Sequence, residues 1–165
     1  MAGRIGLRVT GSRVAVLLVT LAFSGLALPP SAQALGDTCN GRLATSTGLD
    51  ASDQKGPVVL TGTPGDDVII GSDHADSIDG LGGHDVICAG KGGDTVNGGG
   101  GADRIFGEKG DDSISGGAGT DNLYGGDGDD TLNGDGDNTE DELDGGEDDD
   151  TCTGDDNDET SDCEE

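Results

Sequence analysis

The chain lacks the large side chains from which an ordinary globular core is built. Its 165 residues include no tryptophan, one tyrosine and two phenylalanines. Beyond residue 34 it contains no hydrophobic run longer than a few residues. A chain this poor in apolar residues stays disordered unless a repeating motif or a bound ion orders it. The composition therefore excludes a conventional hydrophobic core.

Basic residues are also scarce, with 8 lysines and arginines against 35 aspartates and glutamates. Three of the arginines precede residue 34, so residues 35–165 carry a formal charge of 5 − 35 = −30. Nucleic acids and anionic membranes are bound through lysine and arginine, so neither is an expected partner. The charge indicates cations instead.

The first 34 residues have the pattern of a secretory signal peptide. Three arginines precede an apolar run at 14–23, and Ala-Gln-Ala follows at 32–34. Ten apolar residues are too few to span ~30 Å of hydrocarbon. We therefore expect cleavage after Ala34, export by the Sec route and a secreted, extracellular protein without membrane insertion.

Glycine and aspartate recur in a nine-residue repeat. From Gly62 to Asn133 the chain divides into eight unbroken nonapeptides, among them GGAGTDNLY at 116–124. The sixth position is always aspartate: Asp67, Asp76, Asp85, Asp94, Asp103, Asp112, Asp121 and Asp130. The eighth is always aliphatic: Ile69, Ile78, Ile87, Val96, Ile105, Ile114, Leu123 and Leu132. Because the frame never slips, low complexity alone does not explain the pattern.

These nonapeptides resemble the RTX, or haemolysin-type, calcium-binding repeat, G-G-x-G-x-D-x-U-x. The resemblance is to a small, secreted, bacterial member of that family. It implies an all-β fold, a parallel β-roll of two sheets in which Ca²⁺ lies between turns stacked on the same side. The implied ligands are the eight aspartates above and the fourth-position glycines Gly65, Gly83, Gly92, Gly101, Gly110, Gly119 and Gly128.

The residues fit that implication. Glycines at the first, second and fourth positions permit positive φ and leave backbone carbonyls uncovered. The three residues that follow each aspartate predict a short strand with only its middle side chain inward. Ca²⁺, which takes 6–8 oxygen ligands, would neutralise the aspartates and hold neighbouring turns together. Eight copies give six such sites, and the tail adds one or two, so we expect six to eight ions.

Alternate copies differ at the ninth position, which predicts two sheets with different outer faces. The odd copies carry Ile70, Cys88, Phe106 and Tyr124, whereas the even copies carry Asp79, Asn97, Ser115 and Asn133. One sheet should therefore present an apolar row. We expect residues 35–61 to cover it as an N-terminal capping segment, with 58–60 as a first strand that lacks a calcium ligand.

The four cysteines predict two disulfides, since an even number in an exported chain favours bridges over metal thiolates. Three pairings are possible. We favour Cys39–Cys88, which would strap the N-terminal segment to the apolar row, and Cys152–Cys163, which would close the last turn.

Residues 134–165 contain degenerate repeats and an acidic C-terminal cap. An eleven-residue copy places Asp141 and Leu143 in the ligand and core positions, and the next copy places Asp150 and Cys152 there. Asn133, Asp135 and Asp137 have the spacing of the first EF-hand ligands. Without the required glycine they favour a solvated acidic loop over a calcium turn.

Two copies depart from the consensus, because His74 replaces the fourth-position glycine and Ala89 replaces a first-position glycine. We expect the site between Asp76 and Asp94 to be the weakest. A metal site made by His74 and His84 is the alternative, but exposed turn residues are favoured, since no third ligand lies at metal spacing.

No enzyme motif is found. The sequence contains neither H-E-x-x-H nor G-x-S-x-G, and both histidines lie inside repeats. RTX toxins and enzymes carry a second domain and a C-terminal export signal, which we do not expect here. The sequence predicts a non-catalytic, secreted calcium-binding protein, and the alternative is a calcium-dependent adhesion or interaction module with an unidentified protein or surface partner.

Overall fold

The structure is a computed structural model that describes residues 38–39, 42–43, 49–50, 54–135 and 137–164. The predicted signal peptide and most of residues 35–53 lie outside this part of the chain. Within it there is no helix that could cross a membrane. All regular structure in the described residues is β.

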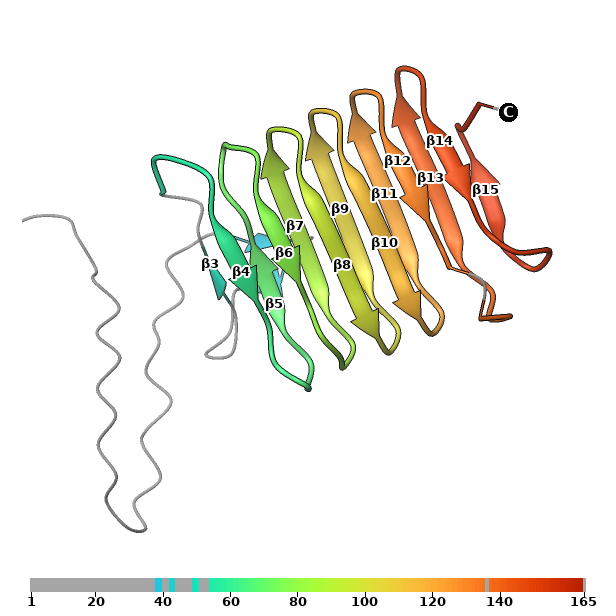
Figure 1. Cartoon of the computed structure of the whole chain (residues 1–165), viewed down its shortest axis with the longest axis horizontal. Helices are drawn as coiled ribbons and strands as arrows, with labels where there is room; N and C mark the ends of the chain where they lie inside the picture. Colours follow the sequence, from blue (N-terminus) through green and yellow to red (C-terminus); the bar gives the residue numbers. More distant parts are fainter. Residues whose placement is uncertain (1–37, 40–41, 44–48, 51–53, 136, 165) are drawn as a thin grey trace, which may run out of the picture.

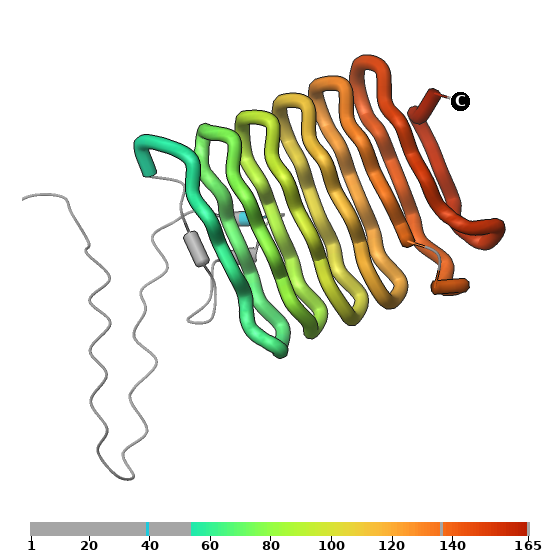
Figure 2. The backbone as a smooth tube through the Cα atoms, in the orientation of Figure 1, coloured from blue at the N-terminus to red at the C-terminus, as the bar shows by residue number. Residues whose placement is uncertain are grey.

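Two parallel sheets face each other as the chain winds into a flattened coil (Figures 1 and 2). The seven-stranded sheet contains β3 (Leu49–Asp50), β5 (Val68–Ile70), β7 (Val86–Lys91), β9 (Arg104–Lys109), β11 (Asn122–Asp127), β13 (Glu142–Glu147) and β15 (Glu159–Ser161). The six-stranded sheet contains β4 (Val59–Thr61), β6 (Ser77–Asp79), β8 (Thr95–Gly100), β10 (Ser113–Ala118), β12 (Thr131–Asn133) and β14 (Thr151–Thr153). β1 (Thr38–Cys39) and β2 (Arg42–Leu43) form a separate antiparallel pair.

Strand pairing follows the period of eighteen. Ile87 pairs with Ile69 on one side and with Ile105 on the other, always in the same sheet. The predicted two-sheet parallel β-roll is confirmed. The predicted strand length is wrong for six strands, which continue for three residues into the next turn. The reason is that the turn backbone keeps the same register, so that Gly90, Glu108 and Gly126 still pair across the sheet.

A single row of aliphatic side chains from each sheet forms the core. All eight predicted eighth-position residues and Leu143 are buried. Leu60 and Cys152 pack against the two ends of this cluster and are partly buried. One inward side chain per strand forms this core, as the repeat predicts, except in β7, where Ala89 is buried in the cluster beside Ile87.

The N-terminal end extends the solenoid further than the sequence indicates. The predicted first strand is present as β4, one residue later than expected, and Leu60 pairs with Ile78. β3 was not predicted, and its Leu49 pairs with Ile69 in the seven-stranded sheet. The capping segment, from which one strand was expected, thus supplies two strands to the solenoid.

The favoured disulfide Cys39–Cys88 is present, with 5.6 Å between its Cα atoms. Cys39 is fully buried in a second small cluster with Val68, Ile70, Val86 and Cys88. This cluster lies on the outer face of the seven-stranded sheet. The cluster includes the beginning of the predicted apolar row. Phe106 packs against it and is partly buried.

At the C-terminal end both degenerate copies keep their predicted places. Leu143 pairs with Leu123, and Cys152 pairs with Leu132. β15 was missed because Asp158 follows Asp141 by 17 residues, so the nine-residue frame slips. The favoured disulfide Cys152–Cys163 joins β14 to the end of the chain.

Candidate metal centre

The glycine turns combine left-handed backbone with very close packing between successive coils. Glycines at the second and fourth positions of most copies have positive φ, including Gly101 at +131°. A Cβ on Gly101 would overlap the carbonyl oxygen of Gly83, one coil away. First-position glycines do not have positive φ, contrary to the prediction. A Cβ on Gly80 would lie 2.5 Å from the Asp85 carboxylate, so glycine is required there for space.

The sixth-position aspartates stand in two columns, one along each turn edge. The odd column contains Asp67, Asp85, Asp103, Asp121, Asp141 and Asp158, whose turns lead into the seven-stranded sheet. The even column contains Asp76, Asp94, Asp112, Asp130 and Asp150, whose turns lead into the six-stranded sheet. All of them except Asp158 are at most 4% exposed.

Every aspartate of the two columns after Asp67 accepts a hydrogen bond from the coil before it. The N–H of Asp94 donates to Oδ1 of Asp112 at 2.7 Å, and the N–H of Asp112 donates to Oδ1 of Asp130 at 2.8 Å. The same bond links every adjacent pair in both columns. One carboxylate oxygen per aspartate is therefore used to hold two coils in register.

In most aspartates of the two columns the second carboxylate oxygen is buried without a hydrogen-bond partner. Among the described residues, Oδ2 accepts no hydrogen bond in Asp85, Asp94, Asp103, Asp112, Asp121, Asp130, Asp141 and Asp150. A buried, unpaired carboxylate oxygen is costly and is normally satisfied by a hydrogen bond or a metal ion. Eight such oxygens in two regular columns leave a regular set of vacant oxygen ligands.

The first aspartate of each column differs from the others. Oδ2 of Asp67 accepts bonds from the N–H and hydroxyl of Thr63 at 2.6 and 3.0 Å. Asp76 accepts the N–H and hydroxyl of Ser72 at 2.7 and 3.0 Å. Gly65, in the turn of Asp67, also lacks the positive φ of the later fourth-position glycines. Ser72 and the N–H of Val58 thus satisfy both oxygens of Asp76, whereas Oδ1 of Asp67 has no partner in the described chain.

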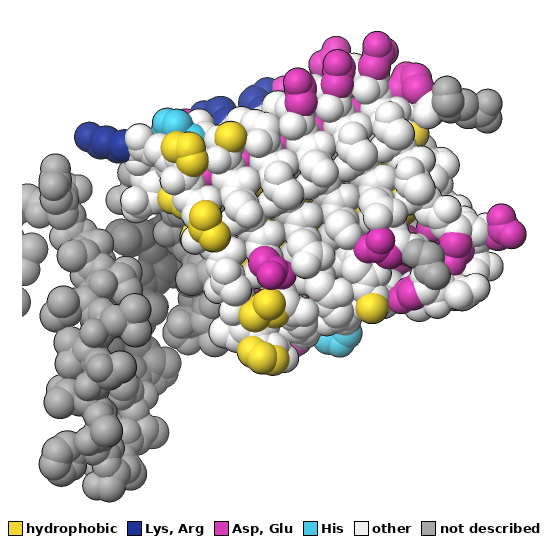
Figure 3. Space-filling view, in the orientation of Figure 1, with side chains coloured by type: hydrophobic (Ala, Val, Ile, Leu, Met, Phe, Trp, Pro, Cys, Tyr) yellow, Lys and Arg dark blue, Asp and Glu magenta, His cyan; other side chains and the backbone are white. Residues whose placement is uncertain are grey.

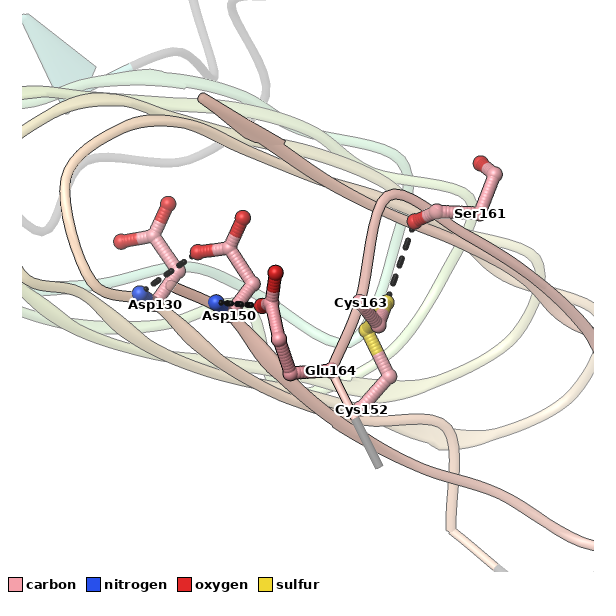
Figure 4. The surroundings of a disulfide bond; sticks show 6 residues. All are labelled: Asp130, Asp150, Cys152, Ser161, Cys163 and Glu164. Atoms are coloured by element: carbon pink, nitrogen blue, oxygen red, sulfur yellow. Dashed lines mark hydrogen bonds between the residues drawn. A yellow bond between two sulfur atoms is a disulfide. The ribbon is translucent and has the colours of Figure 1, made fainter. Parts of the chain in front are cut away.

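The two columns end differently at the C-terminus. In the odd column both oxygens of Asp158 accept hydrogen bonds, from the N–H of Asp141 at 3.1 Å and of Asp155 at 2.7 Å. In the even column the N–H of Asp150 donates to Oε2 of Glu164 at 2.6 Å (Figure 4). Neither Asp158 nor Glu164 was recognised from the sequence. The only available signal was their acidity, because both lie outside the nine-residue frame.

Burial changes the acidity of the columns. Removal from water raises the pKa of Asp112 and Asp121 to about 7, although backbone hydrogen bonds oppose the shift. The same cause raises the pKa of Asp85, Asp94 and Asp130 to about 6. Neighbouring carboxylates in the same column raise these values further. Positive charge is missing from these columns, and a cation would supply it.

The residues fit a hard cation held mainly by backbone oxygen. No cluster of three histidine, cysteine, aspartate or glutamate side chains at metal spacing occurs in the described chain. Each coil offers one carboxylate oxygen per edge, and the remaining ligands would be carbonyls of the glycine turns. Ca²⁺ accepts such mixed, irregular oxygen sets of 6–8 ligands, whereas Mg²⁺ demands a tight octahedron.

Other predicted features lie outside the columns. His74 and His84 occupy opposite turn edges, and Nδ1 of His84 accepts the N–H of Ala102 at 2.8 Å, so the two histidines do not form a pair. Asp135 accepts bonds from Ser115 and Asn133, both at 2.7 Å. Asp137 accepts the N–H of Gly119 and of Thr139. These hydrogen bonds hold the described part of the loop in place.

Further acidic side chains line the even turn edge, where Figure 3 shows them standing side by side near the C-terminal end. The exposed acidic residues of these turns include Asp111, Asp129, Glu147 and Asp149, and also Asp127, which pairs with Lys109. They lie outside the column of buried aspartates and add a negative potential around it, which raises the local concentration of cations.

The fold and the two columns define a parallel β-solenoid built for cations between its turns. In a comparison with protein families, the RTX calcium-binding nonapeptide repeat family matches residues 59–87, 89–123 and 109–140. The solenoid belongs to this RTX calcium-binding repeat family. Comparison with the curated proteins and with the solved structures gave no match. RTX repeats bind calcium, so calcium ions are partners of this chain. The individual ligands and the number of ions stay predictions.

Proposed function

We propose that this protein is a secreted, non-catalytic calcium-binding protein whose β-roll folds when Ca²⁺ binds between its turns. The observation that carries the proposal is the set of nine buried carboxylate oxygens without a hydrogen-bond partner in the described chain, which are Oδ1 of Asp67 and Oδ2 of eight later aspartates. A core of one aliphatic residue per strand is thin, and about 25 cal/mol per Å² of buried apolar area gives it limited stability. Binding energy then becomes folding energy.

Several features support secretion and the absence of catalysis. The signal-peptide pattern of residues 1–34 and two disulfides are both typical of exported proteins. Extracellular calcium sites bind with Kd values of roughly 10⁻⁴ to 10⁻³ M, which matches a protein that folds only after export. The sixth-position aspartates are buried in regular columns and hold successive coils together by hydrogen bonds, which supports a structural role for them.

Far-UV circular dichroism of the oxidised protein, titrated with Ca²⁺ and separately with Mg²⁺, tests the proposal. We expect a cooperative coil-to-β transition with Ca²⁺ alone. A protein that is already β-rich in chelator at pH 8 would contradict calcium-dependent folding. A protein that stays disordered at every calcium concentration would overturn the proposal entirely.

A specific observation favours an interaction module as the second candidate. Phe106 and Tyr124 stack with their ring centroids 4.9 Å apart on the outer face of the seven-stranded sheet, and both are only half-buried. Beside them lies a hollow of about 230 Å³ lined by Cys88, Glu108, Gly125 and Gly126. An apolar patch of this kind marks contact surfaces. Rapid nitration of Tyr124 in the calcium-loaded protein would support an open surface, and protection would contradict it.

A further inference from the structure

The even column continues past the last repeat through a residue that does not belong to the nonapeptide pattern. The N–H of Asp150 donates to the Glu164 carboxylate at 2.6 Å, as the N–H of Asp130 donates to Asp150 at 2.8 Å. Figure 4 shows the carboxylates of Asp130, Asp150 and Glu164 following one another along the solenoid axis. The chain therefore adds one more carboxylate to this column beyond the repeats.

Glu164 reaches this place from a different backbone position. In a regular coil the N–H of Thr151, the residue after the aspartate, donates to the carbonyl of Asp130 at 2.9 Å. The N–H of Glu164 makes the equivalent bond to the carbonyl of Asp150 at 2.8 Å. Glu164 thus lies one residue later than the aspartate position, which Cys163 occupies. The additional methylene of glutamate makes up for the displacement.

The Cys152–Cys163 disulfide holds this segment against the last coil. Cys152 is the inward residue of β14 and pairs with Leu132, and its bridge fixes the residue immediately before Glu164. Without the bridge, the final residues would have only a few backbone hydrogen bonds to keep them in place. The disulfide therefore positions Glu164.

The space beside Glu164 contains an unsatisfied ligand. Asp150 is 0% exposed, and its Oδ2 has no hydrogen-bond partner among the described residues. The turn of Asp150 also contains Asp148 at φ +86°, where the turns of Asp94, Asp112 and Asp130 have glycine. A non-glycine residue in this region is strained, and such strain collects at ligand sites.

The odd column provides the contrast. Its last carboxylate, Asp158, has both oxygens engaged by the N–H groups of Asp141 and Asp155. Glu164 accepts only the Asp150 N–H from the described residues, and Oε1 remains free. One column thus ends closed by hydrogen bonds, and the other ends open.

We propose that Asp150, Glu164 and backbone carbonyls of the 145–150 turn form an additional Ca²⁺ site at the C-terminal end of the even column. It lies outside the nonapeptide repeats and depends on the Cys152–Cys163 disulfide for its geometry. The inference rests on the proposed calcium binding of the repeats. Its consequence is that the end of the solenoid is sealed by an ion as well as by a covalent bond.

Counting bound calcium tests the site. Equilibrium dialysis with calcium alone gives the number of ions on the oxidised wild type and on four variants: Glu164→Gln, Glu164→Asp, Asp156→Asn and the double variant Cys152→Ala with Cys163→Ser. We expect one ion fewer for both Glu164 variants and for the cysteine variant, and the wild-type number for Asp156→Asn, since Asp156 is exposed and lies outside both columns. Glu164→Asp keeps the charge but is one methylene too short. It therefore tests whether the length of the side chain is required in addition to its charge.

The outcomes distinguish the two proposals. A wild type that binds no calcium overturns the proposed function and this inference together. A wild type that binds calcium, with an unchanged count in Glu164→Gln or Glu164→Asp, overturns only the additional site. Circular dichroism of each calcium-loaded variant shows whether its β-roll is formed. If Glu164→Gln does not fold, the calcium counts of Glu164→Asp and of the cysteine variant decide whether the additional site exists.

Discussion

At the scale of single residues, the buried aspartates have opposite effects on the stability of the fold with and without calcium. One oxygen of Asp112 holds the Asp94 N–H, and the other is buried and unpaired. We predict that Asp112→Asn stabilises the calcium-free fold near pH 8, because it removes a buried charge. In a calcium titration it should raise the calcium concentration at the folding midpoint roughly tenfold, since interactions with charged groups contribute ~1.5–3 kcal/mol. Circular dichroism titrations in chelator and in calcium measure both effects.

Asp111→Asn is the matched control, because Asp111 is the exposed neighbour of Asp112 and lies outside the column. It removes the same charge from the same turn. We expect it to change the calcium midpoint much less than Asp112→Asn does. Equal shifts for the two variants would mean that net charge, and not the column, determines calcium binding.

Glycine substitutions test the close approach of successive turns. We predict that Gly101→Ala destabilises the calcium-loaded protein by more than about 2 kcal/mol, because φ is +131° and a Cβ would overlap the Gly83 carbonyl. Gly100→Ala, next to it, should change stability by less than about 0.5 kcal/mol, since the nearest atom to its Cβ would be 4.0 Å away. Urea denaturation of both variants measures the difference, and a harmless Gly101→Ala would contradict the turn geometry.

At the scale of strands, every core strand except β7 contributes a single side chain to the core, and β7 contributes Ile87 and Ala89. Leu123, the inward residue of β11, is 0% exposed and pairs with Ile105 and Leu143. We predict that Leu123→Ala lowers the free energy of unfolding by about 2–5 kcal/mol, because no second layer can fill the cavity. Val59→Ala in β4 should be nearly neutral, since Val59 is 80% exposed. Thermal unfolding in saturating calcium compares them, and equal effects would contradict the one-residue core.

At the scale of the whole molecule, the columns make calcium-free stability depend on pH. Burial raises the pKa of Asp112 and Asp121 to about 7 in the folded state, against 3.8 as the ordinary value. Folding therefore favours the protonated form. Its contribution is fully present below pH 3.8 and is lost as the pH rises through about 6 to 7. We predict that the chelated protein keeps β structure near pH 5 and loses it by pH 8, as measured by circular dichroism.

The same measurement in saturating calcium serves as the control. Bound ions stabilise the ionised carboxylates, so the β structure should persist at pH 8 and weaken as acid protonates the ligands. Opposite pH trends with and without calcium are the expected signature. A chelated protein that becomes more ordered as the pH rises would show that buried columns do not govern its stability.

Much of the fold follows from the sequence, because a solenoid depends on local periodicity. The aspartate and aliphatic positions of the repeat, the period of eighteen and the apolar row at Phe106 and Tyr124 all predicted real features of the two sheets. Each coil contacts mainly its neighbours, so a pattern that repeats along the chain repeats in space. Both disulfide pairings followed from the same frame.

Tertiary structure alone decided how the columns begin and end. Thr63 binds one oxygen of Asp67 and Ser72 binds Asp76, and Asp158 and Glu164 continue the columns beyond the last recognisable repeat. None of these residues keeps the consensus, because at the ends of a solenoid there is no neighbouring coil to impose it. There the requirement is only that a hydrogen-bonding group reach the last turn. Different residues in different registers meet that requirement, and only their placement in space reveals which ones do.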